Sequence, residues 1–71
     1  MPNYIATIRD RSEKVLVWEE TGTALYDTPV IKRNKDAVGR FWTIALRESC
    51  RTVARDRALM MVSKEKVRRG L

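Results

Sequence analysis

The sequence predicts an α+β fold: a small three-stranded antiparallel sheet packed by one main amphipathic helix, with a C-terminal strand or second helix. Short β-branched and aromatic runs separated by polar turns occupy residues 3–33, which is typical of strands. From residue 36 the apolar residues recur with the period of a helix. A chain of 71 residues, 44% of them apolar, suffices for one small core. We therefore expect a single domain over residues 1–71, with a sheet region at 3–33, a helical region at 36–63 and a basic tail at 64–71.

The expected sheet begins with a hairpin. Residues 4–8 and 15–18 are its two strands, and the polar segment Arg9–Lys14 connects them. Gly22 can adopt the positive φ of a following turn, so residues 24–26 are expected to return as a third strand. Pro29 has no N–H to donate, and residues 30–33 are therefore expected to continue this strand at the edge of the sheet.

The main helix is expected over residues 36–56. Asp36 suits the N-cap, because its carboxylate can accept hydrogen bonds from the exposed N–H groups of a first helical turn. At 100° per residue a broad apolar stripe contains Val38, Phe41, Trp42, Ala45, Leu46 and Val53. The alternative is a fourth strand over residues 39–46, with a helix that begins only at Ser49, and the β-rich Phe-Trp-Thr-Ile run supports it. We favour the earlier helix.

Residues 58–62 fit either a final strand or more helix. Leu46, Val53, Met60 and Val67 are spaced seven residues apart, as one heptad position would be. The companion positions 49, 56 and 63 are polar, whereas a coiled coil needs both positions apolar. A helix packed on the sheet is therefore favoured, and a homodimer formed through a helical seam stays open as the alternative.

The charge of the chain is one-sided. The sequence has 15 Lys and Arg against 9 Asp and Glu, a net charge of +6. Residues 1–35 hold six bases and five acids, a net +1, whereas residues 36–71 hold nine bases and four acids, a net +5. A one-sided positive field attracts polyanions. Nucleic acid or an acidic protein surface is the expected partner, and a membrane is not, because the aromatic residues are expected in the core.

The composition argues against catalysis. There is one cysteine, Cys50, and no histidine, so an intrachain disulfide, a zinc site and His-dependent catalysis are all excluded. No Gly-rich phosphate loop follows an expected strand. We expect a non-enzymatic protein without cofactor or metal. No apolar run is long enough to span a membrane or opens the chain as a signal peptide, which favours a cytoplasmic location.

The candidate nucleic-acid site is a set of arginines. Arginine binds phosphate through two parallel hydrogen bonds and stacks on bases. On the expected helix these residues lie opposite the apolar stripe, and the hairpin turn adds two more; the set is Arg40, Arg47, Arg51, Arg55, Arg9 and Arg11. They predict a small non-catalytic protein that binds DNA or RNA, in size and composition like a regulatory or accessory protein of a phage or other mobile element. The alternative is a solvated helix face whose arginine stems cover apolar surface.

A second candidate site is a protein-binding one. Trp18 lies beside Glu19 and Glu20 at the expected end of a strand. Tryptophan is a common hot spot in interfaces, and the two acids could face a basic partner. The alternative function is therefore a small inhibitor or adaptor, such as a phage-type inhibitor of a host complex, that docks on a protein partner.

Overall fold

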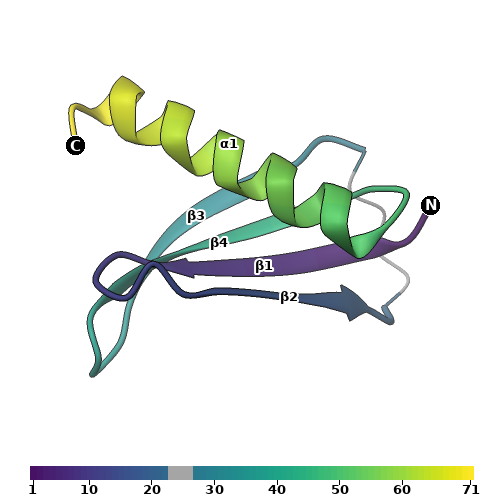
Figure 1. The fold of residues 1–71 in the computed structure, drawn as a ribbon, viewed down its shortest axis with the longest axis horizontal. Helices are drawn as coiled ribbons and strands as arrows, with labels where there is room; N and C mark the ends of the chain where they lie inside the picture. Colours follow the sequence, from purple (N-terminus) through teal and green to yellow (C-terminus); the bar gives the residue numbers. More distant parts are fainter. Residues whose placement is uncertain (23–26) are drawn as a thin grey trace.

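The computed structural model describes residues 1–22 and 27–71, which form one antiparallel sheet with one helix across it (Figure 1). The elements are β1 (Asn3–Arg9), β2 (Val15–Glu20), β3 (Val30–Lys35), β4 (Arg40–Arg47) and α1 (Arg51–Arg69). The strand order is β2-β1-β4-β3, so β1 and β4 are the central strands. The α+β class, with an antiparallel sheet and one helix, is confirmed.

The core lies between the sheet and α1. Alternate residues of each strand face the same side of a sheet, and the helix-facing residues are the buried ones. Trp42, Ile44 and Leu46 of β4 are fully buried. On α1, the small side chains of Ala54 and Ala58 bring the helix close to the sheet, where it packs against β1, β2 and β4. The remaining core members are Tyr4, Ala6, Ile8, Val17 and Val62.

The prediction of three strands is wrong, because the sheet has four. Residues 40–47 form β4 instead of the first part of a helix, which is the alternative assignment weighed above. β4 pairs with β1 on one side and with β3 on the other, so its backbone groups are satisfied on both sides. The helix begins at Arg51, and the expected helical region 36–63 is corrected accordingly.

Asp36 caps a turn and not a helix. Its carboxylate accepts hydrogen bonds from the backbone N–H groups of Val38 (3.0 Å) and Gly39 (3.2 Å). Gly39 has a φ of 144°, which side-chain-bearing residues rarely adopt, and the chain turns back there into β4. Asp36 therefore accepts its capping hydrogen bonds in the tight connection between β3 and β4, and not at the start of a helix.

The C-terminal segment is the main helix itself. Residues 58–62 lie inside α1, and the expected basic tail is helical as far as Arg69. Gly70 adopts the left-handed conformation (φ 74°), and the Leu71 N–H donates to the Lys66 carbonyl (2.8 Å), which closes the helix end. Leu46 belongs to β4, so the seven-residue series is not one helix face. The expected strand at residues 24–26 lies outside the described residues.

One face of the sheet lacks a covering element among the described residues, because α1 packs on the other (Figure 1). In the described part of the chain no helix has the length and apolar character needed to cross a membrane.

Candidate nucleic-acid interface

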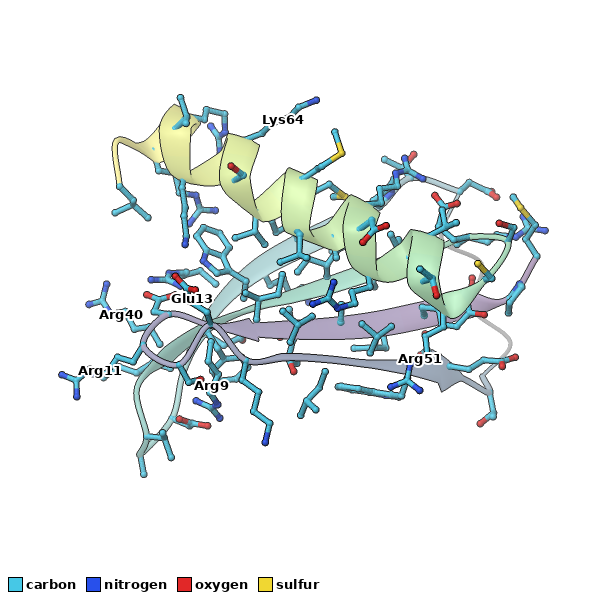
Figure 2. The ribbon with its side chains drawn as sticks, in the orientation of Figure 1. Arg9, Arg11, Glu13, Arg40, Arg51 and Lys64 are labelled. Atoms are coloured by element: carbon cyan, nitrogen blue, oxygen red, sulfur yellow. The ribbon has the colours of Figure 1, made fainter. Side chains whose placement is uncertain are left out.

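The six arginines of the predicted site lie at opposite ends of the molecule. Arg40 and Arg47 are the first and last residues of β4, which places them roughly 23 Å apart at the rise of a strand. Arg9 ends β1 and Arg11 lies in the β1–β2 turn, near Arg40, whereas Arg51 lies at the far end, where α1 begins (Figure 2). A single helix face carrying Arg40, Arg47, Arg51 and Arg55 is therefore wrong, because only the last two belong to α1.

The arginines at the start of α1 are mostly engaged within the protein. Arg47 donates to the Met1 carbonyl (3.1 Å) and to Asp27 (3.3 Å). Arg55 lies 3.8 Å from Asp56, and Arg57 pairs with Glu48. Arg51 is exposed. Among the described residues, Arg51 has no carboxylate oxygen within 4.0 Å, whereas the side chains of Arg55 and Arg57 are 52% and 47% exposed beside their acids.

The opposite end, where the two sheet turns and the end of α1 meet, has a cluster of cations that we call the turn-end patch. The β1–β2 turn contributes two of them, two more flank the β3–β4 turn as register partners, and the last projects from α1. Within residues 1–22 and 27–71, none of the five has a carboxylate oxygen within 4.0 Å. The patch consists of Arg11, Lys14, Lys35, Arg40 and Lys66.

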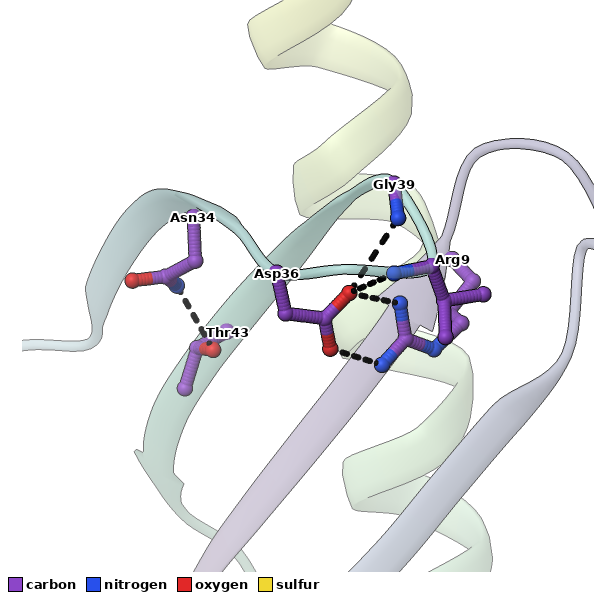
Figure 3. A network of polar contacts seen from close by, with 6 residues as sticks. Arg9, Asn34, Asp36, Gly39 and Thr43 are labelled. Carbon is purple, nitrogen blue, oxygen red and sulfur yellow. Dashed lines mark hydrogen bonds and ion pairs between the residues drawn. The ribbon is translucent and has the colours of Figure 1, made fainter.

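Two of the acids near this patch, Asp36 and Asp10, are paired with other arginines, whereas Glu13 of the β1–β2 turn is exposed. Arg9 donates two hydrogen bonds to Asp36, one of 3.0 Å between Nη1 and Oδ1 (Figure 3). Arg33 likewise donates two hydrogen bonds to Asp10, one of 2.7 Å between Nη1 and Oδ1. The hydrogen bonds from Arg9 lower the pKa of Asp36 to about 2, and those from Arg33 lower the pKa of Asp10. Both carboxylates stay ionised and occupied, so they do not neutralise the turn-end patch.

Arg33 and Arg9 also hold the aromatic side chains beneath them. The Arg33 guanidinium lies 4.5 Å from the centroid of the Trp42 ring, and Arg69 lies 5.1 Å from the same ring. Arg9 lies 4.8 Å from the Phe41 centroid. Cation–π contacts of this kind stabilise the position of both partners. Arg9, Arg33 and Arg69 therefore belong to the framework of the site and do not provide free contacts.

A shallow hollow separates the two exposed arginines of the patch. It has a volume of about 190 Å³, and Arg9, Arg11, Ser12, Val38, Gly39 and Arg40 line it. Arg11 and Arg40 extend outward beyond the end of the sheet from two neighbouring turns (Figure 2). Two guanidinium groups beside a polar hollow can bind a phosphate group through charge-assisted hydrogen bonds. This is the arrangement on the described surface best suited to an anionic ligand.

Trp18, Glu19 and Glu20 form the end of β2 and do not share one face. Trp18 pairs in register with Ile5, and Glu19 with Tyr4, so their side chains lie on opposite faces of the sheet. Trp18 and Glu20 lie on the uncovered face, whereas Glu19 lies on the helix side. The three residues therefore do not make a single docking surface.

Comparison with models of protein families, with curated proteins and with solved structures gives no significant match. No relative therefore indicates a function for this chain. In its described part no group of three or more His, Cys, Asp or Glu side chains gathers as a metal site would.

Three members of the turn-end patch were not among the predicted site residues: Lys14, Lys35 and Lys66. Lys14 follows Arg11 in the same turn, so the sequence carried a local signal for it. Lys66 joins the patch only because α1 returns over the sheet, where it lies close enough to Asp10 to help lower the pKa of that carboxyl after Arg33. Nothing in the linear spacing of residues 11, 40 and 66 indicates that proximity.

Proposed function

We propose that this protein is a non-catalytic, cytoplasmic nucleic-acid-binding protein and that the turn-end patch contacts the phosphate backbone. The observation that carries the proposal is that Arg11 and Arg40 are exposed and line one hollow. The neighbouring carboxylates of Asp36 and Asp10 form ion pairs with Arg9 and Arg33 instead. Because Asp36 and Asp10 are already paired, and neither Arg11 nor Arg40 has a carboxylate oxygen within 4.0 Å among the described residues, the two guanidinium groups retain hydrogen-bond donors for an external ligand.

The patch favours contacts to phosphates over the reading of bases. Its cations come from the two sheet turns and from the last part of α1, rather than from one helix face or one strand pair that could lie along a groove. Contacts to phosphates fix position but carry no sequence information. We therefore propose binding that depends strongly on salt and weakly on sequence, as in accessory proteins that coat or stabilise nucleic acid.

The test compares two double charge reversals that change the net charge equally. Arg11→Glu with Arg40→Glu alters the turn-end patch, and Arg51→Glu with Arg55→Glu alters the opposite end of the molecule. Affinity for a fluorescent duplex and for a labelled single strand is measured by anisotropy at about 50 mM salt, where phosphate contacts are strong. Circular dichroism establishes that both variants are folded.

The proposal predicts a loss of about 100-fold or more in the first variant and only a few-fold loss in the second, since interactions between exposed charges are largely screened beyond about 14 Å at about 50 mM salt. Equal losses in the two variants would mean that binding follows net charge alone. A larger loss in the second variant would place the site at the start of α1.

The second candidate function is an inhibitor or adaptor that binds an acidic protein surface through the same patch. The same free arginines favour it, because carboxylate and phosphate groups present similar oxygen geometry to a guanidinium. Absence of binding to either nucleic acid at low salt, together with capture of an acidic protein that Arg11→Glu with Arg40→Glu abolishes, would support this function over the first.

A further inference from the structure

The face of the sheet opposite α1 has one apolar row of side chains that runs across all four strands, with polar and charged residues in the neighbouring rows. Register places Trp18 beside Ile5, Ile5 beside Ala45, and Ala45 beside Val30. One row of apolar side chains therefore crosses all four strands, from β2 at one edge to β3 at the other. The next row contains Leu16, Thr7, Thr43 and Lys32.

The large side chains of this face are exposed. Leu16 is 50% exposed, Trp18 46% and Val30 40%, and no described element covers them. A contiguous exposed apolar surface that includes a tryptophan marks an interaction site more often than an ordinary surface. The sequence of β2 agrees with this, because apolar residues point to both of its faces, as in a strand that is buried on both sides.

This face has an exposed tryptophan near one edge and a hollow toward the other. Trp18 stands at the β2 edge, whereas a hollow of about 310 Å³ lies toward the β3 edge. Ile5, Val30, Lys32, Thr43 and Ala45 line the hollow, and the side chain of Ala45 is the shortest of the five. A projection and a recess therefore lie in the same row, on opposite sides of the centre of the sheet.

We propose that this face binds a second copy of the chain, with the two sheets packed face to face about a twofold axis parallel to the strands. Such an axis places β2 of one copy over β3 of the other and keeps each row facing itself. Trp18 of each copy then enters the hollow of its partner, so the interface forms two identical contacts, as a closed twofold dimer requires. Sheets that pack in this aligned manner are common.

The chemistry of the hollow suits the indole ring. Ile5, Val30 and Ala45 provide an apolar floor, and Lys32 at its rim provides a cation for the face of the ring. The other aromatic residue on this side, Phe41, already has Arg9 over its ring, so it does not offer a free stacking platform to a nucleic-acid base. The face therefore fits a protein surface of its own shape better than a single strand.

The size of the face predicts a weak dimer. From the spacing of strands and the rise per residue, the face is about 19 Å wide and 20 Å long, roughly 400 Å² per copy. This is below the size of standard interfaces, so we expect a weak, transient dimer. A twofold axis parallel to the strands also leaves both turn-end patches at the same end of the dimer, although the dimer itself does not depend on the proposed function.

Sedimentation equilibrium without nucleic acid tests the proposal directly. Between about 10 μM and 1 mM the mass of the natural chain is expected to rise from 8.3 kDa towards twice that value. Trp18→Glu should weaken dimerisation by about 30-fold or more, as loss of a hot spot does. Met60→Glu is the matched control, because Met60 is 60% exposed on α1 and undergoes the same change of charge. A natural chain that stays monomeric at 1 mM, or equal weakening by both variants, would overturn the proposal.

Cross-linking tests the direction of the axis and does not depend on the stability of Trp18→Glu. In a Cys50→Ser background, Leu16→Cys and Lys32→Cys are prepared as separate proteins, because the axis places these positions opposite each other. A bismaleimide that spans about 10 Å, the distance between packed sheets, should join the two proteins when they are mixed and neither protein to itself. Self-cross-linking of Leu16→Cys would contradict this axis. Cross-linking that requires added nucleic acid would identify the face as a nucleic-acid surface and overturn the proposal.

Discussion

Arg9 donates two hydrogen bonds to the carboxylate of Asp36 and so joins the end of β1 to the turn between β3 and β4. The two residues are 27 positions apart in the chain, and Arg9 lines the hollow whose other lining residues include Arg11 and Arg40. Because the pairing also neutralises Asp36, it leaves the neighbouring cations available to an anionic ligand. The Arg9–Asp36 ion pair thus links the two turns beside the hollow and keeps the Asp36 carboxylate from pairing with the cations of the turn-end patch.

This pairing predicts a dependence of stability on acid pH. The folded pKa of Asp36 is about 2, below the value of roughly 3.9 for an unfolded aspartate. A group with a depressed folded pKa stabilises the fold above its unfolded pKa, and this contribution is lost as pH falls through the folded value. We therefore expect the thermal midpoint to fall between about pH 4 and pH 2. Glu65, whose pKa Arg68 and Arg69 also lower to about 2, contributes in the same direction.

The variant Asp36→Asn isolates the first of these carboxylates. Its thermal midpoint should be lower than that of the natural chain at pH 7 and should fall less steeply from pH 4 to pH 2, because one linked proton is removed. Asp56→Asn is the control, since the nearest guanidinium, that of Arg55, is 3.8 Å away. An Asp36→Asn profile as steep as that of the natural chain would show that this ion pair does not govern acid stability.

A second prediction concerns the core beneath α1. Leu46 of β4 is fully buried, so Leu46→Ala should lower the free energy of unfolding by about 2–5 kcal/mol. A domain of this size has only a few kcal/mol of stability in total, and the variant is therefore expected to be partly unfolded at 37 °C. Urea titration followed by circular dichroism measures the loss. Val38→Ala, at a site 71% exposed, should change the same quantity by less than about 0.5 kcal/mol.

A third prediction concerns the start of α1. Cys50 is the N-cap residue, its backbone is extended, and its side chain makes no capping hydrogen bond. No acid lies in the first turn, so no carboxylate of that turn balances the positive end of the helix dipole. Cys50→Asp should raise the free energy of unfolding by about 1 kcal/mol, whereas Cys50→Ala should not. A urea midpoint for Cys50→Asp equal to that of Cys50→Ala would rule out capping as the cause.

The first hairpin could be predicted from the sequence because its information is local. Residues 4–8 and 15–18 are compact β-forming runs around a polar turn, and the structure places β1 and β2 over them. The edge position of residues 30–33 followed from Pro29, and β3 covers these residues. In each case a few neighbouring residues decide the conformation.

β4 could not be predicted with the same rules. Phe41, Trp42, Ala45 and Leu46 fit the period of a helix, and the same segment also satisfies the alternation of a strand, with Trp42, Ile44 and Leu46 facing inward. The decisive contacts are the backbone pairings of β4 with β1 and β3, which join residues far apart in the chain. Sequence periodicity contains no information on these pairings.

The misplaced arginine site follows from that one ambiguity. On a helix, Arg40 and Arg47 would share a face with Arg51 and Arg55; on a strand of eight residues they lie at opposite ends. Arg11 and Arg40 were both among the predicted site residues, but their proximity depends on the pairing of β1 with β4, which brings two turns together. Which residue types belong to a site is thus easier to predict from the sequence than which of those residues lie together in the fold.

The salt dependence of nucleic-acid binding tests the central claim most directly. If the five cations of the turn-end patch each neutralise one phosphate, log K against log salt for a duplex should have a slope of about −4.5, and Arg11→Gln with Arg40→Gln should reduce its magnitude by about 2. Arg51→Gln with Arg55→Gln should leave the slope unchanged. A slope near zero for the natural chain, or a change of slope only in the second variant, would contradict the proposed interface.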